Sequence, residues 1–245
     1  MKTLIIIPSR LAASRLPMKP LLKIRGLSMI SHVFKKAEEA NIGEVFVAAE
    51  DQEIVDDVKK NGGQAILTSK DHKTGTDRIY ELLKKINRSD IDLVMNLQGD
   101  EPLMNTDDIK NLNDKMIKSN SYLGTLAANI SDKLFYLNHN VVKVLTKENL
   151  DFSKFVEAID FAREALQNTQ NIYHHLGVYC YQLDTLKRFV SLKQSLNEKK
   201  NKLEQLRALD NNIKINVALA KSAPIGVDTE EDYLAIKKIM EYKSE

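Results

Sequence analysis

TLIIIPSRLAASRLPMKPL, residues 3–21, joins a short apolar run to a basic loop. The run from Leu4 to Ile7 has the length and composition of a buried strand. The loop after it carries Arg10, Arg15 and Lys19 among small residues. Arginine presents a planar fork that matches phosphate, and lysine adds a point charge. A buried strand that leads into three cations therefore predicts a polyphosphate site, and a nucleoside triphosphate is the ligand we expect.

Strand-like and helix-like patterns alternate outward from this stretch. This alternation is typical of right-handed βαβ units and a largely parallel sheet. The expected fold is α/β, with a Rossmann-like, three-layer arrangement of a mixed, mostly parallel sheet. Strands are expected at residues 3–7, 44–49, 64–67 and 93–97, and helices at 29–37, 54–58 and 79–86.

The second half of the chain is less regular. No repeat and no Pro/Gly/Ser-rich linker divides it. We therefore expect a single domain over residues 1–245, in which a less regular part at about 131–210 supplies a lid or a dimerisation surface. Strands are expected at residues 123–130, 141–145, 172–181 and 213–220, and helices at 155–166, 203–209 and 230–242.

Composition narrows the class of protein. The net charge of +2 comes from 36 basic and 34 acidic residues, and a general nucleic-acid binder would show a clear basic excess. A single cysteine, Cys180, excludes an internal disulfide and a cysteine-rich zinc site, which fits a reducing cytoplasm. No signal peptide and no membrane-spanning stretch is visible. We expect a cytoplasmic protein with no nucleic-acid or membrane partner.

Gln98-Gly99-Asp100-Glu101-Pro102 directly follows the fourth predicted strand. Open α/β sheets bind ligands beyond the carboxyl ends of their strands. If the first and fourth strands are neighbours, Arg10 and Asp100 meet in one crevice, where Asp100 is suited to hold Mg²⁺ beside substrate phosphates. The plainer alternative is a strand-to-helix turn, with Gly99 at the bend and Pro102 as a helix starter.

Two further loops precede predicted helices. Residues 226–232 read Gly-Val-Asp-Thr-Glu-Glu-Asp, which fits helix capping by Asp228 and Thr229 or a second Mg²⁺ carboxylate. Residues 74–78 read Thr-Gly-Thr-Asp-Arg, which fits a base or phosphate site or ordinary N-capping by Thr76.

The predicted strand at 172–181 is rich in rings. Alternation places His175, Gly177, Tyr179 and Tyr181 on one face, polar enough to bind a hydroxylated substrate, and His174 on the other. The remaining histidines and the cysteine are expected to be surface or packing residues: His32, His72, His139 and Cys180.

Taken together, these segments resemble the 3-deoxy-manno-octulosonate (Kdo) cytidylyltransferases over most of the chain. Single motifs are weak, but their order and completeness make the set specific. They are Ile7-Pro8-Ser9-Arg10 through Arg15-Leu16-Pro17 and Lys19-Pro20-Leu21, residues 74–78, residues 96–102, Asn140-Val141-Val142-Lys143-Val144, residues 175–179, Leu203-Glu204-Gln205-Leu206-Arg207, and residues 227–232.

The resemblance implies a homodimeric enzyme of the nucleotide-diphospho-sugar transferase fold, which transfers CMP from CTP to an acidic ketosugar, releases pyrophosphate and serves surface polysaccharide synthesis. It implies a Mg²⁺ cofactor and catalytic roles for Arg10, Arg15, Lys19 and Asp100. The implied nucleotide-binding residues are Arg10, Ser14, Arg15, Lys19, Thr76 and Arg78. The implied sugar-binding residues are Gln98, His175, Tyr179, Glu204 and Gln205, and the implied metal ligands are Asp100 and Asp228.

Two departures from the family pattern stand out. The family usually has glycine where this chain has Met18. Its Phe-Ser-Arg, followed by an Ile-Pro segment, is Phe152-Ser153-Lys154 here, and lysine lacks the bidentate grip of arginine on a carboxylate. The altered Lys154 region leaves open which acidic sugar is used: Kdo or a close analogue, or instead a nonulosonic or amino sugar. It also leaves open a nucleotide-binding regulator without transfer activity. A UTP- or GTP-dependent transferase or a glycosyltransferase is a further alternative.

Overall fold

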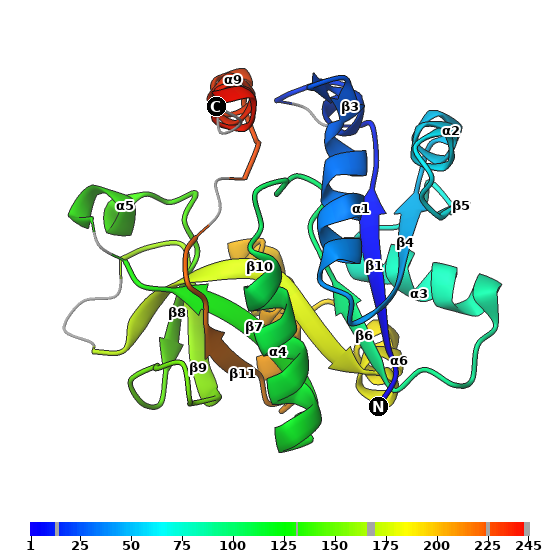
Figure 1. The fold of residues 1–245 in the computed structure, drawn as a ribbon. Coiled ribbons are helices and arrows are strands. Elements are labelled where there is room, and N and C mark those ends of the chain that lie inside the picture. The colour runs from blue at the N-terminus through cyan, green and yellow to red at the C-terminus, as the bar shows by residue number, and fades with distance from the viewer. Residues whose placement is uncertain (13–14, 131, 166–169, 224–225, 243–245) are drawn as a thin grey trace. The chain divides into compact units, whose positions relative to one another are not determined.

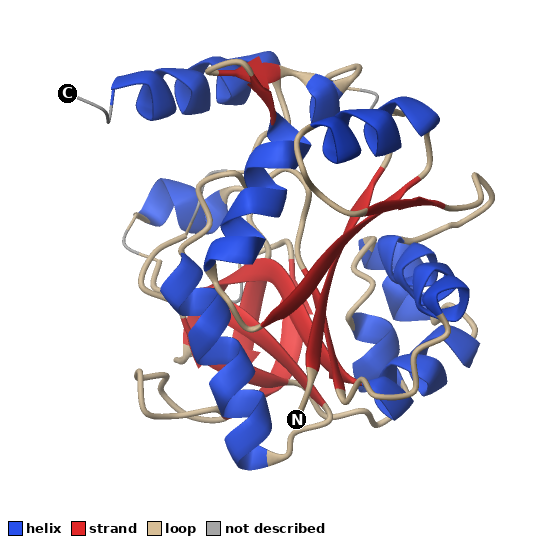
Figure 2. Ribbon diagram, turned by 45° about the vertical axis from the view of Figure 1, so that its right-hand side comes forward, coloured by secondary structure: helices blue, strands red, loops and turns tan. Residues whose placement is uncertain are grey.

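The computed structural model describes residues 1–12, 15–130, 132–165, 170–223 and 226–242 of the chain. Both helices and strands make up large parts of it, which confirms the α/β expectation (Figure 2). The chain splits into two compact units. The N-terminal unit holds residues 2–91, 96–106 and 224–245, and the central unit holds residues 1, 92–95 and 107–223. The expectation of one nucleotidyltransferase domain stays a prediction.

Three parallel strands form the centre of the N-terminal unit. They are β1 (Thr3–Ser9), β4 (Gly43–Ala49) and β5 (Ala65–Leu67), in the order β5-β4-β1. The side chains from Leu4 to Ile7 are fully buried, as the apolar run predicts. The backbone N–H of Leu97 donates to the carbonyl of Ile6 at 3.2 Å. The end of the fourth predicted strand therefore lies beside β1, which is the condition under which Arg10 and Asp100 meet in one crevice.

Helices cover these strands as βαβ crossovers require. They are α1 (Met29–Glu39), α2 (Gln52–Lys60) and α3 (Gly75–Ile86), and α1 lies alongside β1 (Figure 1). The hydroxyl of Thr74 accepts the N–H of Asp77 at 3.2 Å and caps α3. The expected cap by Thr76 is therefore wrong, because Thr76 lies one residue inside the helix with its side chain buried.

A small apolar cluster holds the C-terminal helix in this unit. The 3₁₀ turn η1 (Lys19–Leu21) leads into the hairpin of β2 (Lys23–Ile24) and β3 (Leu27–Ser28). The helix α9 (Glu230–Tyr242) begins after Thr229, whose hydroxyl accepts the N–H of Asp232 at 3.2 Å. The cluster fixes the segment before α9, because Val227 is one of its members. These members are Leu16, Ile24, Met29, Val227 and Ile236.

The central unit contains a mixed sheet in the order β6-β10-β7-β11-β9-β8. In this sheet β7 and β11 pair in parallel, whereas the pairs β10–β7, β10–β8, β11–β9 and β8–β9 run antiparallel. Its strands are β6 (Leu93–Asn96), β7 (Leu123–Ala128), β8 (Lys143–Thr146), β9 (Val156–Ala162), β10 (Ile172–Gln182) and β11 (Asn216–Leu219). Its helices are α4 (Thr106–Ser119), α5 (Lys133–Leu137), α6 (Leu183–Ser191), α7 (Leu196–Asn201) and α8 (Leu206–Asp210).

The expected helix at 155–166 is wrong, because most of this segment is the strand β9. Val156, Ile159 and Ala162 have helical spacing, but the segment is hydrogen-bonded between two neighbouring strands. The N–H of Ala158 donates to the carbonyl of Ile215 at 2.8 Å. Tertiary pairing of this kind overrides a short local pattern, and Ile159 is left half exposed on the strand.

Candidate functional site

A cavity of about 550 Å³ lies in the N-terminal unit, at loops that follow or precede its strands and helices. Lining residues follow β1, precede α3, follow the fourth predicted strand and precede α9. This is the edge where open parallel sheets bind ligands. The lining residues are Pro8, Ser9, Arg10, Ala12, Arg15, Lys19, Pro20, His72, Lys73, Thr74, Gly75, Arg78, Gln98, Gly99, Asp100 and Asp228.

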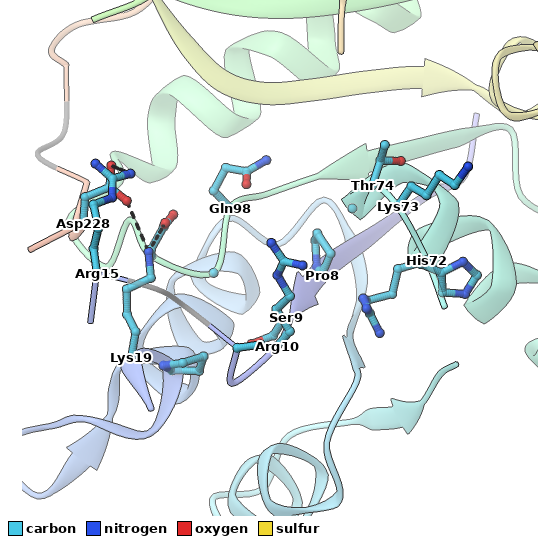
Figure 3. Close-up of a pocket in the computed structure, with 16 residues that line it drawn as sticks. Pro8, Ser9, Arg10, Arg15, Lys19, His72, Lys73, Thr74, Gln98 and Asp228 are labelled. Atoms are coloured by element: carbon cyan, nitrogen blue, oxygen red, sulfur yellow. Dashed lines mark hydrogen bonds and ion pairs between the residues drawn. The ribbon is translucent and has the colours of Figure 1, made fainter. Parts of the chain in front are cut away.

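Opposite charges meet at one end of this cavity. Lys19 Nζ lies 2.7 Å from Asp100 Oδ2 and 3.5 Å from Asp228 Oδ1. Arg15 Nη2 lies 3.1 Å from Asp228 Oδ2. Figure 3 shows Arg15, Lys19 and Asp228 gathered at this end, with Arg10 and Gln98 toward the middle. The structure thus brings together the two carboxylates and two of the three cations that the sequence singled out.

Backbone contacts hold the two carboxylate-bearing loops together. The N–H of Val227 donates to the carbonyl of Asp100 at 3.0 Å. Lys19 Nζ also donates to the carbonyl of Val227 at 2.8 Å. Because the side chain of Val227 is fully buried, the position of Asp228 is set by the apolar cluster behind it.

These two carboxylates fit a magnesium ion. Both lie within 3.5 Å of a single cationic atom, so one cation already reaches them both. Mg²⁺ prefers oxygen ligands and is commonly held by one or two carboxylates together with substrate phosphates. Among the described residues, no group of three or more acidic, histidine or cysteine side chains is placed to hold a metal alone. The donor set therefore suits a metal that arrives with a phosphate ligand.

Glu101 beside Asp100 differs from it. Its Oε2 is buried and finds no hydrogen-bond partner within the described part of the chain. Burial, and then the neighbouring charge of Asp100, raise the pKa of Glu101 to about 8. Asp100 is therefore the member of this pair that presents a carboxylate to Lys19.

The other end of the cavity contains residues that the sequence analysis assigned differently. His72, Lys73 and Thr74 lie there (Figure 3). His72 was expected to be a surface or structural residue; its Nε2 forms a hydrogen bond with Glu81, and the residue also lines the cavity. Thr76 does not line the cavity, but Thr74 and Gly75 of the same motif do. The glycine and the hydroxyl side chains of this motif were the features of the sequence that could indicate a ligand site here.

Arg78 reaches the cavity from a buried position. Its guanidinium forms an ion pair with Glu50 and donates from Nη1 to Thr68 Oγ1 at 2.7 Å and to the Ser69 carbonyl at 3.1 Å. These bonds link α3 to the loop after β5. Arg78 thus shapes the wall of the cavity and brings a charge that is already paired.

Arg10, Ser14 and Met18 of the basic loop, and Gln98, remain to be placed. Arg10 is exposed and lines the cavity, and Gln98 also lines it. Ser14 lies outside the described residues. Met18, at the position where the resembled family usually has glycine, adopts φ of +58°. That left-handed region is one glycine enters freely and other residues enter at a cost of about 1–2 kcal/mol.

The central unit holds the other predicted residues in a ring-rich group, here named the β10 cluster: Phe161, His175, Tyr179 and Tyr181. Ring centroids lie 5.0 Å apart for Phe161 and His175, 5.4 Å for His175 and Tyr179, and 6.2 Å for Tyr179 and Tyr181. The strand pairs Leu176 with Leu126 but Tyr179 with Thr125. The strand β10 therefore has two more residues than β7 at this bulge. Because side chains alternate between the two faces of a strand, an insertion of two residues leaves His175 and Tyr179 on the same face.

Hydrogen bonds determine the tautomer of His175. The Thr125 hydroxyl donates to the carbonyl of Val178 at 2.6 Å, and its Oγ1 lies 3.0 Å from His175 Nε2. Because the hydroxyl has a single hydrogen, Nε2 is the donor in this bond. Burial, and then His174, lower the pKa of His175 to about 3. Burial, and then Lys143, lower the pKa of His174 to about 4. Both rings are neutral near pH 7.

Glu204 and Gln205 lie just before α8 in the same unit. Gln205 is buried and Glu204 is partly exposed. Burial, then Tyr181 and Glu204, raise the pKa of Tyr179, which places Glu204 close to the β10 cluster. None of the four predicted sugar residues of this unit lines the cavity described above: His175, Tyr179, Glu204 and Gln205.

Lys154 lies on a loop before β9. Its Nζ is 3.5 Å from Glu148 Oε2 and 4.0 Å from Asp151 Oδ2, and the side chain is 42% exposed. Exposed pairs of this length contribute little to stability. The ammonium is therefore held weakly.

Within the described residues, no helix is long and apolar enough to cross a membrane.

Known proteins resemble the chain over nearly its whole length. The profile of a family described as cytidylyltransferase matches residues 4–215. The 3-deoxy-manno-octulosonate cytidylyltransferase of Rhodopseudomonas palustris (strain BisB18) is 42% identical, with 98% of each chain covered. The 3-deoxy-manno-octulosonate cytidylyltransferase 2 of Actinobacillus pleuropneumoniae serotype 5b is 40% identical, covering 99% of this chain and all of the relative. A solved CMP:2-keto-3-deoxy-manno-octonic acid synthetase complexed with CTP superposes with a TM-score of 0.89 at 33% identity, covering 99% and 100%.

Proposed function

The chain belongs to the cytidylyltransferase family, and we propose that it transfers CMP from CTP to Kdo and releases pyrophosphate for surface polysaccharide synthesis. The observation that carries the proposal is the cavity in which Arg15, Lys19, Asp100 and Asp228 converge. This charge arrangement is suited to a triphosphate, and relatives of 40–42% identity carry the name of this activity.

The cations of the basic loop bind the triphosphate. Phosphoryl-type transfer depends on positioning and on charge neutralisation more than on covalent help. Arg10, Arg15 and Lys19 stabilise the charge that develops on the leaving pyrophosphate as the sugar hydroxyl attacks the α-phosphorus in line. Thr74 and Gly75 replace Thr76 in our assignment as the cavity residues near the cytidine, because they line the cavity and Thr76 does not.

Asp100 and Asp228 would hold the magnesium ion. When bound, Mg²⁺ supplies charge neutralisation at the phosphates and lowers the pKa of a coordinated hydroxyl. Lys19 lies close to both carboxylates, and its charge favours their approach to one another. The same lysine is then available to a phosphate oxygen.

Gln98 of the N-terminal unit is assigned to the sugar acid on the family resemblance. Within the central unit, the group around the β10 cluster is assigned to the sugar. His175 offers a neutral imidazole whose Nε2 is already engaged by Thr125, which leaves Nδ1 as an acceptor for a hydroxyl. Tyr179 stays protonated and is a hydroxyl donor. Glu204 and Gln205 add acceptor oxygens and an amide. Neutral donors and acceptors, together with the carboxylate of Glu204, suit the hydroxyl groups of a polyhydroxylated substrate.

We further propose a cytoplasmic homodimer. The composition supports the compartment, since the chain carries a single, buried cysteine. The dimer rests on resemblance to the family. Light scattering of the purified protein tests it, and a monomer at micromolar concentration would remove it.

Pyrophosphate release with CTP, Mg²⁺ and Kdo tests the main proposal. We expect turnover with Kdo above that with a panel of other octulosonic and nonulosonic acids, and competition by CDP stronger than by UDP or GDP. Replacing Mg²⁺ with EDTA should abolish release. CTP binding by calorimetry without turnover on any sugar would favour a binding protein and contradict the proposal.

A further inference from the structure

Arg207 lies between two carboxylates of the central unit. Its Nε is 2.9 Å from Glu198 Oε2 and its Nη2 is 2.5 Å from Glu198 Oε1, a bidentate pair. The same Nη2 lies 3.6 Å from Glu204 Oε1. The guanidinium of Arg207 therefore contacts two carboxylates. Glu198 has no role in the proposed function, whereas Glu204 is assigned to the sugar.

Glu198 is a fixed anchor for this arginine. It belongs to α7, where it forms a capping box with Ser195, whose N–H donates to Oε2 at 3.1 Å. Gln194 donates to Oε1 at 3.1 Å. Each carboxylate oxygen thus receives two donors. Burial alone would raise the pKa of Glu198, but the hydrogen bonds from Arg207 and Gln194 lower it below its ordinary value, so the pair is charged.

The guanidinium is also confined by packing. Its central carbon lies 4.6 Å from the ring centroid of Phe189 on α6. Arg207 and Glu198 are 3% and 4% exposed in their side chains, whereas Glu204 is 30% exposed. Arg207 is therefore immobile, while Glu204 keeps a face that a ligand can reach.

The backbone between them is equally constrained. The N–H of Arg207 donates to the carbonyl of Glu204 at 3.0 Å, and the N–H of Leu206 donates to that of Leu203 at 3.2 Å. Residues three apart in such a turn share a face. The 3.6 Å approach of Nη2 to Glu204 is too long for a strong hydrogen bond, so the contact orients the carboxylate by charge.

We propose that Arg207 is a positioning residue that holds the Glu204 carboxylate in the orientation that binds the sugar acid. This inference rests on the proposed function, because it assigns Glu204 to the sugar. A planar fork is needed, since two nitrogens engage Glu198 while one of them also faces Glu204. Lysine has a single ammonium and cannot keep both relations in the same geometry.

A double-mutant cycle in the full-length enzyme tests it. Arg207→Lys is measured alone and together with Glu204→Gln, with CTP and Kdo varied separately and active enzyme counted by CTP titration. We expect Arg207→Lys to raise KM for Kdo about tenfold, a coupling common within one contact network, with kcat and KM for CTP within about twofold. In the Glu204→Gln background the same change should raise KM for Kdo less than about twofold.

Arg188→Lys is the matched control, because Arg188 is an exposed arginine of the same unit that donates to the carbonyl of Asn211 at 3.0 Å. A merely structural Arg207 would lower the melting temperature and the active fraction but leave KM for Kdo unchanged, which would overturn the inference. Equal effects in both backgrounds would overturn it too.

Phe189→Leu serves if Arg207→Lys does not fold, since it removes the ring beneath the guanidinium and keeps an apolar side chain. A rise of a few-fold in KM for Kdo that vanishes with Glu204→Gln supports the inference, and no rise overturns it. Failure of the proposed function is separate: the unmodified enzyme would then release no pyrophosphate from CTP and Kdo, and the inference would fall with it.

Discussion

In the cavity of the N-terminal unit, charged side chains face one another on loops that solvent reaches. In the β10 cluster of the central unit, rings are packed together and the histidines are kept neutral. Arg15 and Asp228 are each at least half exposed, whereas His175 is buried. The contrast matches two recognition problems: a polyanion needs compensating charge, and a hydroxylated sugar needs fixed neutral donors and acceptors.

The largest effect is expected from Asp100→Asn, which tests whether charge is essential in the cavity of the N-terminal unit. The change removes the charge that faces Lys19 at 2.7 Å and leaves a side chain of the same shape. We expect turnover to fall about 10²–10³-fold, the range seen when one electrostatic group at a reacting centre is removed. Pyrophosphate release measures it, and an unchanged melting temperature shows that the fold is intact.

The control is Asp107→Asn, since Asp107 is paired with Lys221 at 2.7 Å on the surface of the central unit. It should retain activity within about twofold. Full activity of Asp100→Asn would show that Asp100 is not a metal ligand and that its charge is not needed in the cavity.

The next test concerns the neutral side of the comparison. The pKa of His175 falls from 6.5 to about 3 on folding, so the unfolded chain binds more protons below pH 6.5. Its contribution to stability is present above pH 6.5 and is lost as pH falls toward the folded pKa. Between pH 7 and 5 the wild type should lose about 2 kcal/mol more unfolding free energy than His175→Gln.

Urea unfolding at the two pH values measures this difference. His139→Gln, at an exposed histidine, should behave as the wild type does. Parallel pH profiles of wild type and His175→Gln would mean that His175 ionises freely, and the contrast between the two regions would weaken.

A smaller effect is expected at the position that departs from the family pattern. Lys154 is weakly held by Glu148 and Asp151, and Lys154→Arg restores the fork that suits a carboxylate. We expect KM for Kdo to fall about threefold, with KM for CTP unchanged. Lys147→Arg, in an exposed pair with Glu157, is the control. A fall in KM for CTP instead would assign this loop to the nucleotide.

The smallest effect is expected at Met18. Met18→Gly removes the energetic cost of the left-handed conformation in the folded chain. Glycine also gives the unfolded chain more conformational freedom, which offsets part of this gain. We therefore expect the free energy of unfolding to rise by about 0.5–1 kcal/mol. Thermal or urea unfolding measures it, and Met18→Ala should show no such gain. Destabilisation by glycine would mean that the methionine side chain contributes contacts of its own.

Sequence patterns were most informative where the chemistry is local. Arg10, Gln98 and Asp100 come shortly after buried strands, and because parallel strands end at one edge, their meeting in the cavity could be predicted. The same local periodicity found β1, β4 and β5 and the helices α1, α2 and α3, but it missed the turn η1 and the short hairpin of β2 and β3.

The rest depended on contacts between distant segments. The strand β9 was predicted as a helix because its apolar residues have helical spacing and one of its partners, β11, is remote in sequence. The role of Thr74 as the cap and of His72 as a lining residue depends on where α3 begins, which periodicity fixes only within a few residues. The bridge from Glu198 through Arg207 has no short motif at all.

The residues that line the cavity also have a consequence for how quickly a ligand arrives. Within the described residues they include five lysines or arginines, Arg10, Arg15, Lys19, Lys73 and Arg78, against the two aspartates Asp100 and Asp228. Arg78 is paired with Glu50, but the lining still holds more basic than acidic residues, so a local positive field is expected at this opening although the whole chain carries a net charge of only +2. Such a field draws a polyanion toward the opening before any contact forms. The association rate of CTP should therefore fall steeply with ionic strength in stopped-flow measurements, while an uncharged nucleoside approaches at a rate that salt leaves unchanged.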